Sequence, residues 1–476
     1  MSLQKSGHSR RSFLKYSVYG GLGLSAVLVS RCAVNRKPNV IFLLTDDQRR
    51  DTLGVAGNAL IHTPNMDRLA AEGVLFENAF VTTAICAVSR ASIFTGQYAR
   101  RHGIHDFGTD FSPEQLAHTY PLQMKAAGYR IGFIGKYGVG NNLPEAEYDY
   151  WRGVPGQPDY ETTDDEGNPV HCTRLFGNQA IEFLDTVTPE QPFCLSVSFK
   201  APHVQDGDPR QFIPDPAFNH LYQDVTVPKP VTATAAHHAA LPDFLRSEDA
   251  MTRVRWHLRF ENDELYQTRV KNYYRLISGV DEVLGRIRKQ LAERKLDDNT
   301  VIALLGDNGF FLGEYGWAGK WYAHEPSIRV PLVIYDPRLP QSRRGQVRPE
   351  MALNIDVAPT FLDLAGITPP PATQGTSLLP LMQGKQPEWR TDFFYEHLFH
   401  VPEARHDEAG YIPASVGVRT ERYKYIRWFE QTPVYEELYD LQQDAYEEHN
   451  LVNSVEHKEI LSQLRNRCDQ LKEELM

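Results

Sequence analysis

Two pairs of side chains that carry oxygen atoms lie far apart in the sequence, and each pair follows a run of apolar residues. Asp46 and Asp47 come shortly after the first run. Asp307 and Asn308 come shortly after the second. Carboxylate and amide oxygens suit Ca²⁺, or Mg²⁺, better than zinc, although such residues at strand ends also cap helices and turns. Either pair alone is ambiguous, but the two pairs together predict a metal site.

A single cysteine is a candidate nucleophile. The sequence predicts a helix that begins just after Cys86 and ends at Gly96, which places the thiol at a helix N-terminus. Backbone N–H groups and the helix dipole favour anions at such a position. Arg90, one turn further on, would add a fixed positive charge beside it. A lone cysteine is more often a buried apolar residue, so its role depends on its surroundings.

Buried strands are needed to position these residues. The segments 39–44, 130–134, 193–198 and 300–305 are rich in apolar residues, and a helical pattern covers residues 274–293. The alternation of strand and helix patterns predicts an α/β fold with a central, mostly parallel mixed sheet flanked by helices. In such sheets ligands bind outside the carboxyl ends of the strands, so we expect the polar residues there to converge.

The C-terminal part of the chain has a different pattern. Prolines at 369–371 begin a predicted linker, and residues 460–475 have the spacing of an amphipathic helix. The strands predicted between them cover 393–396, 415–419 and 423–428. We therefore predict a large domain over residues 37–370 and a small α+β domain with a short antiparallel sheet over residues 385–476.

Composition excludes some classes of protein. The 476 residues include 50 Lys and Arg against 61 Asp and Glu, a formal charge of -11, which argues against bulk attraction to nucleic acid or to an anionic membrane. An anionic substrate would need a local cluster of positive charge. The five cysteines are too few and too scattered for a disulfide framework, and they are Cys32, Cys86, Cys172, Cys194 and Cys468.

The N-terminus has the pattern of an export signal. The segment from Ser9 to Lys15 contains the arginine pair and precedes a Gly-rich apolar run over residues 16–30. We predict a twin-arginine signal over residues 1–31, read by the twin-arginine export machinery, and a periplasmic or secreted protein. The run is shorter than the roughly 20 residues of a membrane span. Arg31 argues against lipid attachment at Cys32.

The segment around Cys86 resembles the signature of type I sulfatases, a family in the alkaline phosphatase superfamily. Cys86-Ala87-Val88-Ser89-Arg90 is similar to the family pattern C-x-P-S-R and precedes an Ala-Ser-x-x-Thr-Gly stretch. The resemblance extends from Pro38 through Asp440, and the joint order of its motifs is highly specific. Its other motifs are Asp46-Asp47, Gly135-Lys136, Ala201-Pro202-His203, Asp307-Asn308-Gly309, Gly319-Lys320, Ser327-Ile328-Arg329-Val330-Pro331 and Leu438-Tyr439-Asp440-Leu441.

The resemblance implies a modified nucleophile and a bound ion. Cys86 would be oxidised to Cα-formylglycine (3-oxoalanine) by a formylglycine-generating or an anaerobic sulfatase-maturating enzyme. The hydrated aldehyde would then be the nucleophile. Ca²⁺ would be held by an oxygen of modified Cys86 together with Asp46, Asp47, Asp307 and Asn308.

The resemblance also implies roles for four basic residues. Arg90 and Lys136 would steady the hydrate. His203 and Lys320 would hold the sulfate and protonate the leaving alcohol, and Lys136 would share in substrate binding. His324 could face the substrate or pair with Glu325 to brace its loop, and the sequence leaves both open.

The implied reaction is hydrolysis of a sulfate ester on carbohydrate, from glycosaminoglycan or algal-type polysaccharide fragments. A sulfate monoester is anionic, so the ion and the basic residues would neutralise charge during attack. One hydroxyl of the hydrate would attack sulfur. Loss of the proton from the second would expel sulfate and restore the aldehyde.

Two positions depart from the family pattern. Val88 replaces the proline of the signature, and Gly138 stands where the family commonly has a histidine that takes the proton of the hydrate. His102 and His105 are the remaining candidates for that base. Two other functions stay open: a phosphonate monoester or phosphodiester hydrolase of the same superfamily, and a non-catalytic, calcium-stabilised glycan-binding protein in which the thiol persists.

Overall fold

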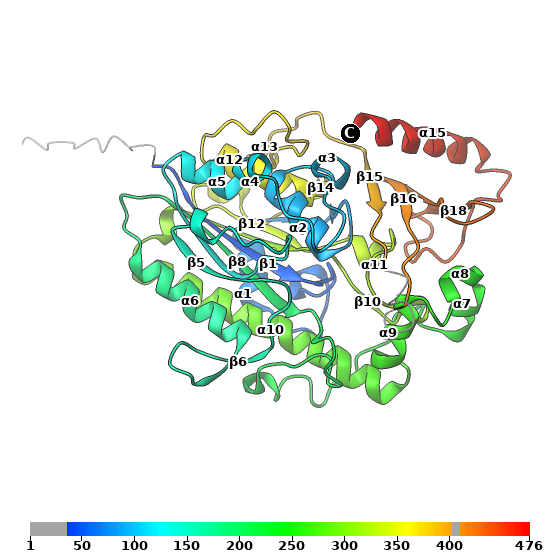
Figure 1. Ribbon diagram of the computed structural model, residues 1–476, viewed down its shortest axis with the longest axis horizontal. Coiled ribbons are helices and arrows are strands. Elements are labelled where there is room, and N and C mark those ends of the chain that lie inside the picture. Colours follow the sequence, from blue (N-terminus) through cyan, green and yellow to red (C-terminus); the bar gives the residue numbers. More distant parts are fainter. Residues whose placement is uncertain (1–35, 402–409) are drawn as a thin grey trace, which may run out of the picture. The chain divides into compact units, whose positions relative to one another are not determined.

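An eight-stranded sheet runs through the centre of the computed structural model, which describes residues 36–401 and 410–476 (Figure 1). Its order is β13-β2-β12-β9-β1-β8-β4-β5. The four strands predicted from the sequence form its middle and are mutually parallel. They are β1 (Asn39–Asp46), β4 (Arg130–Lys136), β8 (Phe193–Pro202) and β9 (Thr300–Gly306). The predicted fold class is confirmed.

Four shorter strands complete the sheet. The sequence does not predict them, because each is only three to five residues long and has little pattern of its own. They are β2 (Val74–Phe76), β5 (Tyr150–Val154), β12 (Leu332–Tyr335) and β13 (Gln346–Arg348). β12 pairs antiparallel with both β9 and β2, so the sheet is mixed.

The register of the sheet brings the polar ends of the central strands together. Leu44 of β1 pairs with Leu305 of β9, so Asp46 and Asp307 leave the sheet at the same edge. On the other side of β1 the pairing with β8 is shifted between Leu44 and Asp46, and Asp46 lies opposite Pro202. The expected convergence at the carboxyl ends of the strands is therefore observed.

Helices cover both faces of the sheet (Figure 1). Successive side chains of β1 point to opposite faces, so Phe42 and Leu44 belong to one apolar core and Ile41 and Leu43 to the other. The first core includes residues of α2 (Cys86–Thr95), α5 (Tyr120–Ala126) and α12 (Val357–Leu364). The second includes residues of α1 (Pro64–Glu72), α6 (Cys172–Thr186) and α10 (Asp263–Glu293).

The longest helix is longer than the sequence indicated. The apolar pattern predicted a start at Tyr274, but α10 begins at Asp263. The side chain of Asn262 caps it by accepting a hydrogen bond from the backbone N–H of Leu265 at 2.9 Å. The first turns are rich in polar residues, which hid them from an analysis based on apolar spacing.

The C-terminal part of the chain contains a four-stranded antiparallel sheet, which confirms the predicted short sheet. Its strands are β15 (Asp392–His397), β16 (Ser415–Thr420), β17 (Tyr423–Trp428) and β18 (Tyr435–Asp440). The helix α15 (Lys458–Glu474) packs against it, close to the predicted bounds. Residues 37–476 group together as one compact unit, and the boundary predicted between residues 370 and 385 stays a prediction.

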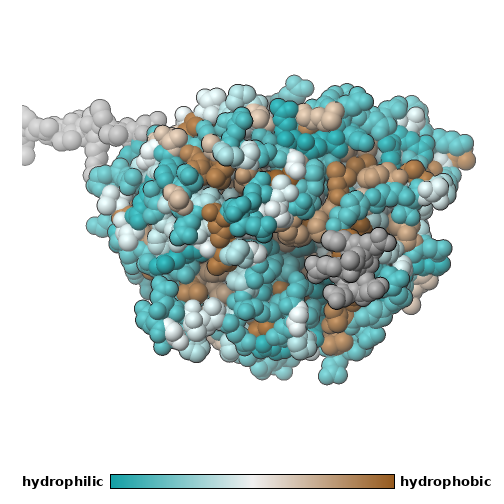
Figure 2. Space-filling model, in the orientation of Figure 1, coloured by the Kyte–Doolittle hydropathy of each residue, from teal (hydrophilic) through white to brown (hydrophobic). Residues whose placement is uncertain are grey.

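The molecular surface in Figure 2 is mostly hydrophilic on the face drawn, with apolar side chains in small groups. The predicted export signal over residues 1–31 and Cys32 lie outside the described residues. In the two described ranges, none of the helices combines the length and the apolar composition of a membrane span. The four cysteines described there are buried, and none of them forms a disulfide.

Phe42 tests the importance of the first core. Its side chain is 2% exposed, and its ring lies edge to face with Phe361 at 5.4 Å and with Tyr120 at 6.3 Å between centroids. We expect Phe42→Ala to lower the free energy of unfolding by about 3–5 kcal/mol, measured by urea denaturation. Phe429→Ala removes a ring that is 40% exposed and should cost less than about 1 kcal/mol. Equal losses would contradict this assignment of the core.

Candidate active site

Cys86 is the first residue of α2 and is almost fully buried. The helix ends at Gly96, whose φ of 69° is left-handed, and its predicted extent is confirmed. The Cys86 thiol donates to Asp46 Oδ1 at 3.1 Å, and Lys320 Nζ donates to Cys86 Sγ at 2.7 Å. Burial, together with the charge of Asp46, raises the pKa of the thiol. Unmodified Cys86 is therefore a neutral thiol in contact with charged groups.

The two pairs of metal-ligand candidates meet beside Cys86. The backbone N–H of Asp47 donates to Asp307 Oδ1 at 3.1 Å, and Asn308 Nδ2 donates to Asp47 Oδ1 at 2.6 Å. Asp47 has a left-handed backbone with φ of 66°. The hydroxyl of Tyr273 on α10 donates to the Asp47 carbonyl at 2.6 Å and holds this turn. Tyr273 was missed in the sequence because an aromatic residue at helical spacing indicates only a core position.

Three basic side chains neutralise the carboxylates. Arg90 Nε donates to Asp307 Oδ2 at 2.9 Å, and Arg90 Nη1 donates to the carbonyl of Lys136 at 2.7 Å. Lys136 Nζ donates to Asp46, and Lys320 Nζ donates to Asp47. All of these side chains are at most 4% exposed. We call the following set the buried cluster: Asp46, Asp47, Cys86, Arg90, Lys136, His203, Asp307, Asn308 and Lys320.

The protonation of the cluster follows from burial and charge. Burial alone would raise the pKa of Asp46, but the positive charge of Lys136 and its neighbours outweighs burial and lowers that pKa well below its usual range. Burial, together with the negative charge of Asp46, raises the pKa of Asp307 to about 6. The charge of Asp47 raises the pKa of Lys320 in spite of burial, so this ammonium stays protonated.

His203 follows a cis peptide bond between Ala201 and Pro202. Its Nδ1 lies 2.8 Å from the carbonyl of Val204, which can only accept, so Nδ1 carries the hydrogen. Burial lowers the pKa of His203 to about 4, in spite of the carboxylates of Asp47 and Asp46. The lone pair of neutral Nε2 therefore lies on the side of Asp47 Oδ2, 3.5 Å away.

The donor set of the buried cluster fits a hard divalent cation. Ligand atoms of Asp46, Asp47, Cys86 and His203 all lie within 4.8 Å of one another. Within the described residues, Asp47 Oδ2 and Asn308 Oδ1 are buried without a hydrogen-bond partner. Unpaired buried oxygens are costly, and a bound ion would satisfy them. Oxygen ligands dominate, which suits Ca²⁺ or Mg²⁺.

His324 lies elsewhere. It is buried among aromatic rings, including Phe311 and Trp317, and its Nε2 lies 3.9 Å from Glu437. None of its contacts among the described residues is with the buried cluster. Glu325 forms an ion pair with Lys424 at 2.8 Å. The contacts of His324 and Glu325 therefore favour a role in bracing their loop over contact with the substrate.

The site has no histidine at the position where the family commonly has one. Gly138 has φ of 74°, and a Cβ there would lie 2.9 Å from Arg90 Cδ, so a side chain at this position would displace Arg90. His102 does not replace it, because its ring nitrogens bond Ser92 Oγ at 3.0 Å and the N–H of Ile104 at 3.1 Å. His105 has no described contact with the cluster.

One exposed residue reaches the buried cluster and was not found from the sequence. Gln157, in the loop after β5, donates from Nε2 to Asp46 Oδ2 at 3.0 Å. A lone glutamine in a Pro- and Gly-rich loop carries no signal. Val88, the other departure from the signature, is 1% exposed and belongs to the first apolar core.

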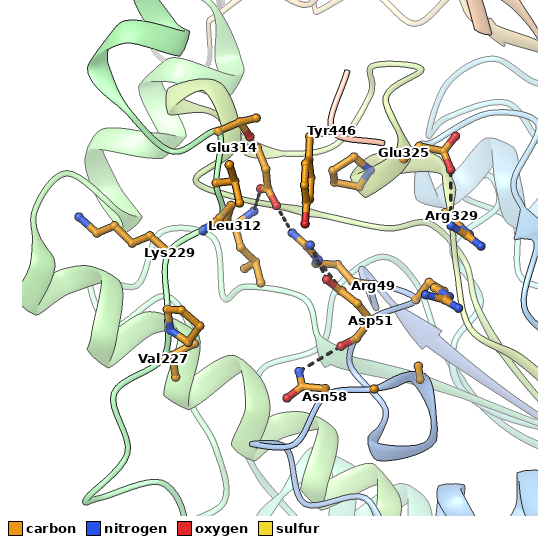
Figure 3. A pocket seen from close by; sticks show the side chains of 18 of the residues that line it. Arg49, Asp51, Asn58, Val227, Lys229, Leu312, Glu314, Glu325, Arg329 and Tyr446 are labelled. Carbon is orange, nitrogen blue, oxygen red and sulfur yellow. Dashed lines mark hydrogen bonds and ion pairs between the residues drawn. The ribbon is translucent and has the colours of Figure 1, made fainter. Parts of the chain in front are cut away.

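A cavity of about 710 Å³ lies beside the segment that follows Asp47 (Figure 3). Arg49 lies across it, bonded to Glu314 and, at 2.7 Å, to Asp51. Figure 3 shows these three side chains as a connected row. No member of the buried cluster lines the cavity, so it is separate from the candidate site.

Comparisons with known proteins place the chain in a family. The sulfatase family matches residues 38–367, and the family described as N-sulphoglucosamine sulphohydrolase, C-terminal, matches residues 313–474. The chain belongs to the sulfatase family, whose members are sulfuric ester hydrolases within the alkaline phosphatase superfamily.

Similar proteins are spread over several substrates. An N-acetylglucosamine-6-O-sulfatase of Bacteroides thetaiotaomicron is 29% identical over 95% of this chain and 91% of that protein. An arylsulfatase of Clostridium perfringens is 30% identical over 90% and 93%. A solved structure described as a complex with its substrate D-glucosamine-2-N,6-O-disulfate has a TM-score of 0.77 and 26% identity, over 92% of this chain and 98% of that one. A phosphonate monoester hydrolase of Agrobacterium radiobacter, with a TM-score of 0.76, 22% identity and coverage of 92% and 96%, shares the fold.

Gly138 provides a test of the position of Arg90. We expect Gly138→Ala to lower kcat/KM for an aryl sulfate by about tenfold or more, because the new Cβ must displace Arg90. Gly57→Ala is the matched control, since Gly57 has φ of 96° but nothing within 4 Å of its Cβ position. The backbone conformation should cost each variant about 1 kcal/mol of stability, and Gly138→Ala should lose more because Arg90 must move. Similar activity in the two variants would contradict the crowding at Arg90.

Proposed function

We propose that this protein hydrolyses sulfate esters on carbohydrates, with a formylglycine made from Cys86 and with Ca²⁺ in the buried cluster. The observation that carries the proposal is the place of Cys86. Its Sγ lies at the start of α2, within hydrogen-bond distance of the Asp46 carboxylate and the Lys320 ammonium. An oxygen formed at that position would stand between a metal ligand and a proton donor.

The ion would be held by an oxygen of modified Cys86 together with Asp46, Asp47, Asp307 and Asn308. When bound, it would neutralise negative charge on the sulfate oxygens. The charge count supports this, because three carboxylates already balance Arg90, Lys136 and Lys320. A divalent cation would leave the site positive and attractive to an anionic ester.

The side chains of the cluster would then divide the work. Arg90 and Lys136 would hold and orient the oxygens of modified Cys86 through fixed positive charge. Lys320 is a protonated group 2.7 Å from Cys86 Sγ and would supply the proton to the leaving alcohol. Neutral His203 presents a lone pair and would accept a hydrogen bond or a proton beside Asp47.

The carbohydrate substrate is proposed from the relatives, one of which is named for N-acetylglucosamine 6-O-sulfate and another for ulvan. The proposal also includes modification by a maturation enzyme. It includes export by the twin-arginine machinery to the periplasm or the cell exterior. The phosphonate monoester hydrolase shares the fold, but fold alone does not decide the reaction.

Modification and turnover test the proposal together. After co-expression with a formylglycine-generating enzyme, mass spectrometry of the tryptic peptide 69–90 should show the aldehyde at residue 86 in place of the thiol. kcat/KM for a 4-nitrophenyl sulfate should then exceed that for a 4-nitrophenyl phosphonate. Cys86→Ala should abolish turnover without loss of fold. An intact thiol would refute the nucleophile, and faster phosphonate turnover would favour the other hydrolase.

Calcium binding gives a second test. Asp307→Asn removes one ligand charge while it keeps the side-chain shape, and we expect the calcium affinity to fall by about tenfold or more by titration calorimetry. Asp224→Asn, at an exposed position, is the control and should bind calcium as the unaltered protein does. Unchanged affinity in Asp307→Asn would show that the ion lies elsewhere.

A further inference from the structure

A second group of basic side chains lies beside the buried cluster. The helix α9 (Met251–Arg259), labelled in Figure 1, packs against β11 (Ala318–Gly319), the short strand that leads into Lys320. Arg255 and Arg259 stand one turn apart on α9. Both guanidinium groups approach Asp206 Oδ1, at 3.7 Å and 3.6 Å. Because Asp206 is three residues after His203, this group borders the proposed reaction centre.

Arg259 is buried but only partly paired. Its side chain is 1% exposed, and its Nε donates to Gln211 Oε1 at 2.9 Å. Its Nη2 lies 3.6 Å from Asp206, which is too far for a hydrogen bond. Within the described residues, its Nη1 is buried with no hydrogen-bond partner. Buried guanidinium N–H groups without acceptors are costly, so the site lacks an acceptor.

The charges of the group do not balance. Arg255 and Arg259 share the single carboxylate of Asp206. Burial, together with the positive charge of Arg255, lowers the pKa of Arg259 to about 9. Burial alone would raise the pKa of Asp206, but Arg255 and other positive charges outweigh it and lower that pKa to about 2. Asp206 is thus already ionised, and one positive charge remains in excess.

The group is open to solvent on one side. The side chain of Arg255 is 22% exposed and that of Asp206 52%. The Arg255 guanidinium lies over the ring of Trp321, 5.1 Å from its centroid, and Trp321 follows Lys320 directly in the chain. Trp321 itself is buried, 4% exposed, so it forms a firm base for the guanidinium. The exposed part of Arg255 is accessible to a soluble ligand.

We propose that Arg255 and Arg259 bind a second anionic group, a sulfate or a carboxylate, on the saccharide whose sulfate ester is cleaved. This rests on the proposed function. The backbones of His203 and Asp206 are at most about 10 Å apart, so a second anion near Asp206 would lie on the same sugar as the ester or on the next one. Guanidinium groups bind carboxylate and sulfate oxygens through charge-assisted hydrogen bonds. The substrate class is thus a saccharide with at least two anionic groups.

Binding to an inactive protein tests the proposal apart from catalysis. In the Cys86→Ala background, titration calorimetry would compare N-acetylglucosamine 6-sulfate, which has one anion, with two ligands that have two. These are N-sulfoglucosamine 6-sulfate and a disaccharide that joins N-acetylglucosamine 6-sulfate to a uronic acid. We expect the two-anion ligands to bind about tenfold tighter or more. The ligand that gains more identifies the second anion as sulfate or carboxylate.

The arginine variants complete the test. Arg255→Met and Arg259→Met should each remove most of this preference for two anions. Arg253→Met is the matched control on the same helix, because Arg253 pairs with Glu248 at 3.0 Å and should leave the preference intact. Arg255 is partly exposed, so its variant remains informative if Arg259→Met does not fold. Equal affinities for one-anion and two-anion ligands, or a preference that survives in the variants, would overturn the proposal. Failure of the sulfatase proposal would instead appear as absent turnover in the protein with Cys86.

Discussion

The burial of three carboxylates against three cationic side chains at one edge of the sheet is the constraint on which the rest of the site depends. A single charge left there without a partner would cost several kcal/mol, so each member of the set requires the others. Arg90 shows this best, because it bonds the Asp307 carboxylate from β9 and the Lys136 carbonyl from β4. It therefore joins α2 to two strands and fixes the start of the helix, where Cys86 stands.

This constraint also explains the main departure from the family pattern. The backbone at Gly138 passes so close to Arg90 that any side chain there, including the expected histidine, would have to displace Arg90. In the proposed reaction, neutral His203 and protonated Lys320 would then handle the protons. Gln157, in an exposed loop, donates to the same carboxylate as Lys136, so Asp46 contacts both an exposed residue and a buried one.

The fold provides the frame and leaves the choice of substrate to the elements around it. Sulfatases and a phosphonate monoester hydrolase share this sheet and its helices, so the sheet alone does not select the ester. The residues that would select it lie outside the buried cluster. Arg255 and Arg259 on α9 are charged groups beside Lys320 whose hydrogen bonds and charges are incompletely matched. A helix next to the site can thus set specificity without altering the chemistry.

The sequence by itself determined the central strands, the extent of α2 and the residues of the buried cluster, because apolar runs and ordered motifs are local signals. It did not determine the four short strands of the sheet, the start of α10 at Asp263, or the roles of Tyr273 and Gln157. The roles of Tyr273 and Gln157 depend on partners more than 100 residues away, Asp47 and Asp46. The start of α10 lies in a polar first turn that apolar spacing does not mark. The position of His324 was likewise decided by packing, since an aromatic layer surrounds its ring. Tertiary structure decided these points because hydrogen bonds, burial and crowding between distant segments leave no trace in local residue patterns.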